Sequence, residues 1–455
     1  MIQAMPGGAN DARAHVDART VSTLTAAALT IADMVGIGVF TSLGFQVAAI
    51  PSAFAILVLW LTGGLVALSG ALSYAELGAA LPRSGGEYNF LSRIYHPVVG
   101  FMSGWLSATV GFAAPTALAA MALGSYMTGI VPGLSPVAVG LGVTVAVTLV
   151  LMAGMRLGAL FQNVTTLFKV GLILALTVAG FVTGSAAPAV SFTPVAGDLA
   201  LIASPAFAIS LVYVLYAYSG WNAATYIAGE VRDPQRALPL SILAATAIVV
   251  VMYVALNASF LYATPMADLK GQLDVGLVAG RHILGDAGGR AVGLLICFGL
   301  LSSISALMWI GSRVVVTMGE DLAPLRLFAR KTRGGVPIVA LGFQLAVVVA
   351  LILTQRFEAV LEYVQFSIML CSWLTVFGVY VLRWREPDLP RPYRTWGYPL
   401  MPLVFLGLTA FMLIYLARER PIQSLAGLAT MLAGGCVFFL LGAKSAPATS
   451  PVRSV

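Results

Sequence analysis

Two short stretches that contain glycine interrupt long apolar runs of the chain. One is Gly36-Ile37-Gly38 in the first run, and the other is Tyr216-Ala217-Tyr218-Ser219-Gly220 in the sixth. Because a glycine costs a helix about 1 kcal/mol relative to alanine, each stretch predicts local unwinding. Free N–H groups at such a break favour an anion, and free carbonyl oxygens favour a cation. The pair predicts a small-molecule site, and close helix packing through small residues is the alternative. The residues expected to bind the molecule are Val35, Gly36, Ile37, Gly38, Val39, Tyr216, Ala217, Tyr218, Ser219 and Gly220.

Two ionisable side chains lie inside apolar runs near these stretches. Lys169 lies deep in the fifth run, and Asp33 lies about one helical turn before Gly36. An ionisable group within a membrane is costly and usually functional.

Asp33 leaves more than one interpretation open. It could pair with Lys169, bind a cation or a substrate amine, or face a vestibule on the cytoplasmic side. A contact with a substrate amine would favour cationic substrates.

These residues need a scaffold of membrane-spanning helices. The chain has 455 residues, of which 59% are hydrophobic and 9% charged, against roughly 25% charged residues in soluble domains. A bilayer accepts that much apolar surface, and a soluble core does not. The sequence therefore predicts an all-α membrane protein with twelve transmembrane helices of about 20 residues or more. The twelve apolar runs are 22–50, 53–80, 97–130, 135–154, 157–184, 201–231, 238–262, 289–320, 336–355, 358–384, 398–417 and 422–442.

The distribution of lysine and arginine predicts the orientation. With the N-terminus in the cytoplasm, seventeen of these residues lie in cytoplasmic segments, six in outer segments and two within runs. This bias predicts a multi-pass protein of the cell membrane with both termini cytoplasmic. The broken runs are five spans apart, as expected of two inverted five-helix repeats. The predicted divisions are a tail at 1–20, repeats at 21–184 and 201–384, two further helices at 398–442, and a tail at 443–455.

Charged residues gather at the predicted cytoplasmic ends of the second and sixth runs. Arg83 and Glu87 follow the second run, and Glu230 and Asp233 follow the sixth. We expect ion pairs between the 81–89 loop and the end of the sixth run to close an inward gate. A solvated charged surface is an equal alternative.

The chain resembles the amino acid–polyamine–organocation superfamily of transporters, and is most similar to its bacterial amino acid permeases and L-type exchangers. Five stretches carry the resemblance, and they occur in the family's order over nearly the whole chain. They are Gly36-Ile37-Gly38-Val39-Phe40; Ala75-Glu76-Leu77 with Leu81-Pro82-Arg83-Ser84-Gly85-Gly86-Glu87-Tyr88; Gln162-Asn163 with Lys169; Tyr216-Ala217-Tyr218-Ser219-Gly220-Trp221-Asn222 with Gly229-Glu230-Val231-Arg232-Asp233-Pro234 and Arg236-Ala237-Leu238-Pro239; and Arg391-Pro392-Tyr393-Arg394 with Gly397-Tyr398-Pro399.

The resemblance implies a LeuT-like fold, with two inverted five-helix repeats plus two helices, and a substrate site near the bilayer midplane. It implies that the substrate carboxylate meets N–H groups at the first break. The substrate ammonium would meet carbonyl groups around Tyr216, the family's aromatic gate. Ile37 takes the place of a small hydroxyl residue, which widens the expected substrates to bulky amino acids or amines without a carboxylate.

The resemblance also implies that Lys169 replaces a sodium ion, a cation between the first, fifth and eighth runs. On that ground we expect the Lys169 ammonium to bond to the break in the first run and to hydroxyls of the eighth run, and so to couple occupancy to conformation. A lysine held statically by carbonyl groups is the alternative. The hydroxyls belong to Ser302, Ser303 and Ser305.

The sequence thus predicts a sodium-independent secondary transporter of amino acids, acting by alternating access as an exchanger or a proton symporter. A polyamine or organic amine carrier, and an amino acid sensor that does not transport, are the alternatives. We expect no enzymatic activity, no cofactor, no metal and no nucleic acid partner, because Cys297, Cys371 and Cys436 lack nearby cysteine or histidine partners and no Gly-x-x-x-x-Gly-Lys loop occurs. The connection near Val131-Pro132-Gly133 has no cysteine, which animal L-type exchangers use to bind a heavy chain. We therefore expect no such partner.

Overall fold

The fold is built from helices of very different lengths. The computed structural model describes residues 19–183, 190–272, 274–354 and 357–441. No strand occurs among these residues, although Val21 and Val231 form one isolated parallel bridge. The α-helices are α2 (Thr23–Met34), α3 (Gly38–Ala49), α4 (Ala53–Ala80), α5 (Glu87–Ile94), α6 (Pro97–Leu106), α7 (Ala113–Ile130), α8 (Pro136–Ala153), α9 (Met155–Val182), α10 (Asp198–Ile202), α11 (Pro205–Ala217), α12 (Ala223–Tyr226), α13 (Pro234–Ala263), α14 (Met266–Leu269), α15 (Val275–Asp321), α16 (Ile338–Thr354), α17 (Phe357–Arg385), α18 (Leu400–Glu419) and α19 (Pro421–Leu440). A π-helical turn, η1 (Ser107–Gly111), joins α6 to α7, and two 3₁₀ turns are η2 (Ala228–Glu230) and η3 (Ala323–Leu325).

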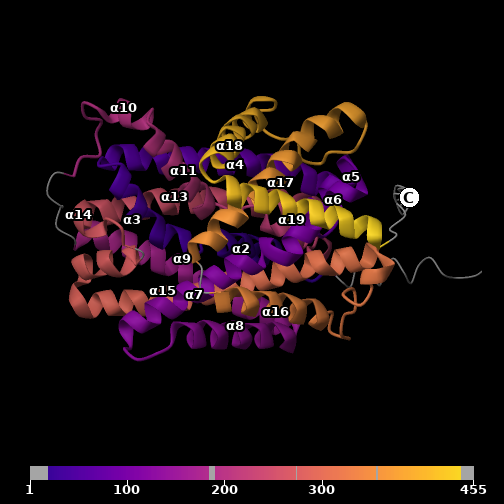
Figure 1. The fold of residues 1–455 in the computed structure, drawn as a ribbon, viewed down its shortest axis with the longest axis horizontal. Coiled ribbons are helices and arrows are strands. Elements are labelled where there is room, and N and C mark those ends of the chain that lie inside the picture. The colour runs from indigo at the N-terminus through magenta and orange to yellow at the C-terminus, as the bar shows by residue number, and fades with distance from the viewer. Residues whose placement is uncertain (1–18, 184–189, 273, 355–356, 442–455) are drawn as a thin grey trace, which may run out of the picture.

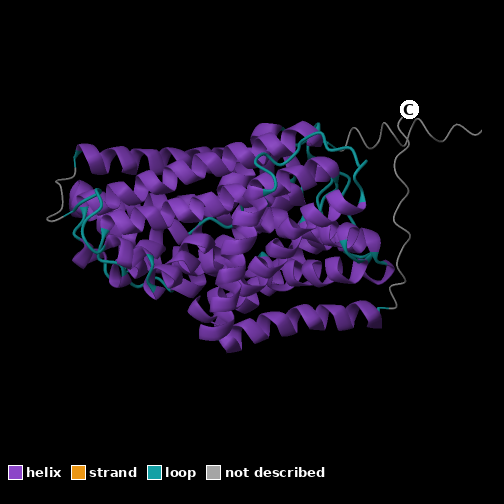
Figure 2. Ribbon diagram, turned by 90° about the horizontal axis from the view of Figure 1, so that it is seen from above, coloured by secondary structure: helices purple, strands orange, loops and turns teal. Residues whose placement is uncertain are grey.

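Most of the long helices run along one axis of the molecule, and the loops gather at its two ends (Figures 1 and 2). α4 has 28 residues, which at 1.5 Å per residue gives about 42 Å and exceeds a hydrocarbon core of about 30 Å. In the described part of the chain, ten helical segments are long and apolar enough to cross a membrane, and α11 and α16 are shorter apolar helices. The predicted all-α membrane class is confirmed. The predicted twelve spans are reached only when these two shorter helices are counted.

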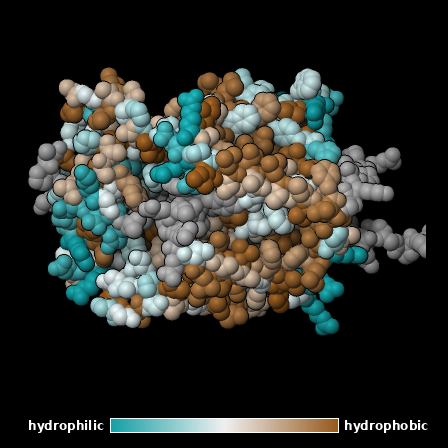
Figure 3. Space-filling model, viewed as in Figure 1, coloured by the Kyte–Doolittle hydropathy of each residue, from teal (hydrophilic) through white to brown (hydrophobic). Residues whose placement is uncertain are grey.

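Apolar side chains cover much of the surface between the two ends (Figure 3). On α8 and α9 the exposed fraction is 60% for Leu149, 61% for Leu160 and 74% for Leu167. Leucines exposed in a row along two neighbouring helices would be unfavourable in water, whereas lipid accepts them. These helices therefore form part of the surface that faces the membrane.

The interior is formed by helices distant in sequence. α13 packs against α4 and α2, and α15 packs against α7 and α9. Short connections alternate between the two ends of the bundle. One end, which we call the basic end, carries 81–86, 227–233, 322–337 and 386–399 together with most of the described arginines.

Two predicted spans need a closer description. The sixth run, 201–231, is interrupted as predicted, and consists mainly of α11, a non-helical stretch, α12 and η2. The eighth run was predicted to begin at 289. α15 starts at Val275, but Gly285, with φ of 73° and ψ of −179°, is not helical and divides α15 into two helical parts, of which the second begins close to the predicted position. The tails 1–20 and 443–455 lie outside the described residues except for Arg19 and Thr20, and the inverted relation of the two halves stays a prediction.

Candidate functional site

The first apolar run is interrupted where the glycines predict it. α2 ends at Met34, α3 begins at Gly38, and residues 35–37, which we call the first break, are not helical. No side chain caps the first N–H groups of α3. The first N–H groups of a helix have no partner within the helix, and they carry partial positive charge. The first break therefore offers a site for an anion.

The second interruption lies opposite the first. α11 ends at Ala217 and α12 begins at Ala223, with residues 218–222, the second break, between them. Gly220 adopts a φ of 99°, a left-handed conformation that glycine reaches without strain. The Tyr253 hydroxyl on α13 lies 2.7 Å from the Met34 carbonyl oxygen and 3.2 Å from that of Ala217. One side chain thus joins the two breaks, and nothing in its sequence position indicated this role.

The glycines of the first break have different surroundings. A Cβ on Gly38 would lie 2.8 Å from the Cα of Ala217, whereas a Cβ on Gly36 would meet no atom within 4 Å. Gly38 therefore allows close packing of the two breaks. Gly36 instead faces open space. Close helix packing therefore accounts for Gly38, and a small-molecule site accounts for Gly36.

This difference makes a matched pair of substitutions informative. Gly38→Ala is expected to lower the thermal midpoint of unfolding, because the new methyl group meets backbone that cannot move aside. Gly36→Ala is expected to leave the midpoint unchanged but to weaken ligand binding, because the methyl group enters the cavity. Thermal unfolding in detergent, with and without ligand, measures both effects. Equal midpoints for the two variants would contradict this assignment.

A cavity of about 80 Å³ lies between the two breaks. Its volume accommodates a few water molecules or a small polar solute. Among the predicted site residues, it is lined by Asp33, Gly36, Ile37, Gly38, Tyr216, Ala217, Ser219, Gly220 and Ser303, together with Glu87 from the predicted gate. Sequence reasoning missed Met34, Leu106, Ser107, Gly111, Phe112, Pro115, Ala119, Asn222, Tyr226, Leu307 and Ile368. Of these, Asn222 and Tyr226 continue the stretch that had drawn attention to Tyr216.

Three of the residues predicted to bind the substrate lie beside the cavity rather than in its lining. Val35 and Val39 are buried, and Val35 contributes its carbonyl oxygen to the contact described next. Tyr218 is 1% exposed and packs against Trp60 and Tyr253 at ring-centroid distances of 5.7 and 5.0 Å. Tyr218 therefore lies at a helix interface and not in the lining of the cavity.

Lys169 makes the contact that was expected of it. Its Nζ donates to the carbonyl oxygens of Ala32 at 3.2 Å and Val35 at 2.6 Å, and to Ser303 Oγ at 2.8 Å. The side chain is 1% exposed. The ammonium therefore joins α2, α9 and α15 at the first break. Its role in coupling stays a prediction.

The other two serines on α15 have different surroundings. Ser302 Oγ lies 3.1 Å from Gln162 Nε2 and 3.0 Å from Thr166 Oγ1 on α9. Ser305 is buried, and its hydroxyl has no hydrogen-bond partner among the described residues. Of the three candidates, only Ser303 meets the lysine.

Asp33 faces the cavity and lies against the second break. A Cβ on Gly220 would lie 2.7 Å from Asp33 Oδ2, so the glycine makes room for the carboxyl group. Asp33 Oδ1 is buried and lacks a hydrogen-bond partner in the described part of the chain. No ion pair joins Asp33 to Lys169 within that part. A buried oxygen with an unused acceptor, directed at a cavity, suits a ligand that donates hydrogen bonds.

The ion pairs predicted for the inward gate, between the 81–89 loop and the end of the sixth run, are wrong. Arg83 forms an ion pair with Asp321, and Glu230 forms one with Arg313 at 2.7 Å. Asp321 and Arg313 both lie on α15. This helix extends into the basic end and lies close enough to Arg83 and to Glu230 to pair with each of them. Asp233 is exposed and makes no ion pair among the described residues. The 81–89 loop meets the sixth run through neutral groups instead.

The neutral contacts at the basic end come from backbone groups. Gly229 N donates to Ser84 Oγ at 2.8 Å, and Gly85 N donates to the Tyr226 carbonyl oxygen at 3.1 Å. Glu87, the fourth predicted gate residue, turns away from these contacts into the interior and is 3% exposed.

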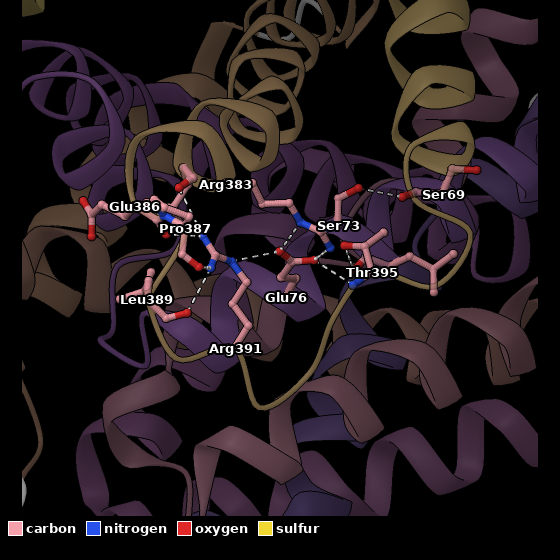
Figure 4. Close-up of polar contacts among 11 residues, drawn as sticks. Ser69, Ser73, Glu76, Arg383, Glu386, Pro387, Leu389, Arg391 and Thr395 are labelled. Carbon is pink, nitrogen blue, oxygen red and sulfur yellow. Dashed lines mark hydrogen bonds and ion pairs between the residues drawn. The ribbon is translucent and has the colours of Figure 1, made fainter.

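A second buried carboxylate, Glu76, lies near the end of α4 and is 2% exposed (Figure 4). Arg383 on α17 donates two hydrogen bonds to it, of 2.8 and 2.6 Å. Thr395 N donates at 2.6 Å, and Arg391 Nε lies 3.5 Å from its Oε1. Glu76 therefore fixes the 386–399 connection against α4, and its contacts join the stretch Ala75-Glu76-Leu77 to Arg391-Pro392-Tyr393-Arg394.

Comparison with known proteins gives one family and several full-length relatives. A family model described as "Amino acid permease" matches residues 21–437. "Large neutral amino acids transporter small subunit 2" of Mus musculus is 26% identical over 436 residues, covering 93% of this chain and 81% of the relative. "Asc-type amino acid transporter 1" of Rattus norvegicus is 27% identical over 439 residues, covering 93% and 81%. "b(0,+)-type amino acid transporter 1" of Mus musculus is 26% identical over 434 residues, covering 93% and 88%.

Proposed function

The chain belongs to the amino acid permease family, and on that premise we propose that it transports amino acids without sodium, as an exchanger or a proton symporter, by alternating access around the cavity. The observation that carries this proposal is the contact of Lys169 with the first break and Ser303. An ammonium on a side chain supplies, at this joint of three helices, the positive charge that a dissolved cation would otherwise bring. Because this positive charge belongs to the protein, it is present whether or not the buffer contains sodium.

The two breaks suit the two charged groups of an amino acid. The N-terminus of α3 faces the cavity at Gly36 and Gly38 and suits a carboxylate. The second break lies on the same cavity, and the Asp33 carboxyl of α2 faces it there. Carbonyl groups of the second break and this carboxyl suit an ammonium. We place the substrate in the cavity between the first break and the second break. For the orientation in the membrane, we propose that both chain termini lie in the cytoplasm.

Uptake of radiolabelled amino acids into proteoliposomes tests this function. We expect uptake to be the same in sodium and in choline buffers, and to depend on internal amino acid or on a pH gradient. Binding without uptake under all these conditions would support a sensor and contradict the proposal. A strict requirement for sodium would contradict the role given to Lys169.

The same experiment addresses the partner. The "small subunit" in the name of one group of relatives implies a larger subunit for those proteins. We propose that this chain works without one, because the 131–135 connection, which would have to provide the covalent link, contains no cysteine. Uptake by the purified single chain is the expected result, and inactivity reversed only by an added subunit would contradict it.

Asp33 supports a second candidate, a carrier of organic amines. A buried carboxyl with an unpartnered oxygen can receive an ammonium without help from a substrate carboxylate. We expect Asp33→Asn to weaken binding of cationic amines and basic amino acids by about tenfold or more, since a hydrogen bond to a charged group contributes roughly 1.5–3 kcal/mol. Neutral amino acids should lose less. Competition of each class against one labelled substrate measures the ratio, and an equal loss for all classes would rule out this role.

A further inference from the structure

Glu87 is a carboxylate that the transport model above does not use. It is the first residue of α5, a short helix between two membrane-spanning helices, and it lines the same cavity as Asp33. Gly85 and Gly86, with φ of 105° and 52°, turn the chain so that Glu87 points inward. A Cβ on Gly86 would lie 2.5 Å from the Tyr226 ring. The two glycines thus bury the carboxylate beside the cavity.

The hydrogen-bond partners of Glu87 come from three separate elements and none carries a charge. Its Oε1 accepts from the Tyr74 hydroxyl on α4, from Ser372 Oγ on α17 at 2.8 Å, and from Asn222 Nδ2 in the second break at 3.4 Å. Among the described residues, no lysine, arginine or histidine forms an ion pair with it. Arg83 and Arg313 are bound to other carboxylates. A buried carboxylate without a cation is costly as an anion.

The other titratable groups around Glu87 add no positive charge. Tyr74 faces it from α4, Tyr226 from α12 and Cys371 from α17. Asp33 of α2 lies on the same cavity, and it brings no positive charge either. Burial raises the pKa of Glu87 to about 7, although the hydrogen bonds from Tyr74 and Ser372 oppose this shift. The carboxyl therefore takes up a proton as the pH falls through neutrality and releases it as the pH rises.

We propose that Glu87 is the proton-binding site of the transport cycle, so that a proton enters with the substrate and leaves at the basic end. The proton adds to the carboxylate of Glu87 from water in the cavity and returns to water, and no other bond forms or breaks. This inference rests on the proposed function and narrows it to proton symport.

Protonation of Glu87 has two physical consequences for transport. Neutralising the Glu87 carboxylate removes its repulsion against a substrate carboxylate, so proton and zwitterion are favoured together. In addition, hydrogen bonds to a carboxylate are stronger than those to a neutral carboxyl group. Protonation therefore weakens the hydrogen bonds by which Glu87 holds α4, α17 and the second break together. In this way, binding of a proton is linked to movement of these elements.

The test compares proteoliposomes that contain the wild type, Glu87→Gln or Glu87→Asp. With one proton per substrate, a pH gradient of one unit, acidic outside, drives at most about tenfold accumulation, because one unit corresponds to about 1.36 kcal/mol. We expect the wild type and, more weakly, Glu87→Asp to accumulate labelled amino acid. Glu87→Gln should lose accumulation but retain exchange of external label for internal substrate. Asp286→Asn, an exposed carboxylate away from the cavity, is the matched control and should behave as the wild type.

The outcomes separate the two proposals. No uptake of any amino acid by the wild type contradicts the proposed function. Uptake by the wild type that a pH gradient does not drive, or accumulation by Glu87→Gln equal to that of the wild type, overturns the role of Glu87. If Glu87→Gln does not fold, a pH-sensitive dye inside wild-type vesicles decides instead. Substrate addition that moves no protons overturns the inference, and proton entry whose pH profile shifts in Glu87→Asp supports it.

Discussion

Lys169→Met is expected to slow amino acid uptake by about tenfold to a hundredfold, because a hydrogen bond to a charged group contributes roughly 1.5–3 kcal/mol and about 1.4 kcal/mol corresponds to a factor of ten in rate. Methionine keeps the length and apolar character of the stem but removes the ammonium. The carbonyl oxygens of Ala32 and Val35 and the hydroxyl of Ser303 then lose their shared donor. The first break would no longer be tied to α9 and α15.

The measurement is the initial rate of uptake, normalised to the amount of protein in the membrane. Lys270→Met is the control, since Lys270 is an exposed lysine in the connection between α14 and α15. Loss of rate in both variants would point to a general effect of removing a positive charge. An unchanged rate, affinity and pH dependence in Lys169→Met would end the coupling hypothesis.

Glu76→Ala is expected to lower the stability of the protein by roughly 3–5 kcal/mol, the usual cost of removing one partner from a buried ion pair. Arg383 and Arg391 would remain at the site without their carboxylate, and Thr395 N would lose its acceptor (Figure 4). The 386–399 connection would then come away from α4. Glu76→Gln should fall between the wild type and the alanine variant, because an amide oxygen can still accept from Thr395.

Glu386→Ala is the matched control for this loss. Glu386 also pairs with an arginine, Arg93 at 2.6 Å, but both side chains are about a third exposed or more. An exposed pair contributes about 0–1 kcal/mol. Thermal midpoints measured in one detergent should therefore fall clearly for Glu76→Ala and little for Glu386→Ala. Similar shifts of the thermal midpoint in the two variants would show that Glu76 does not hold the 386–399 connection against α4.

Local signals in the sequence were sufficient for most of the helices and for both breaks, and the family resemblance supplied one contact. Hydropathy located the spans because lipid selects apolar residues over the whole length of a helix. The glycines located the breaks because their effect on the backbone is local. The contact between Lys169 and Ser303 was predictable only with the family resemblance, which implies a cation between the first, fifth and eighth runs, although a deeply buried ammonium has to find oxygen atoms in any case.

The side-chain partners at the basic end could not be predicted in the same way. Arg83 pairs with Asp321 rather than with the end of the sixth run, since the choice depends on how far α15 extends. Glu87 was grouped with exposed charges, although the left-handed Gly85 and Gly86 turn it inward. Both outcomes depend on packing between segments that are far apart in the chain, which no local pattern encodes.

The position of Tyr253 has a consequence for movement of the two breaks. Its hydroxyl lies within hydrogen-bond distance of two carbonyl oxygens, that of Met34 beside the first break and that of Ala217 beside the second. A phenol has a single proton to give, so the hydroxyl divides one hydrogen bond between the two acceptors. Any movement that separates the two breaks therefore has to give up at least one of these contacts.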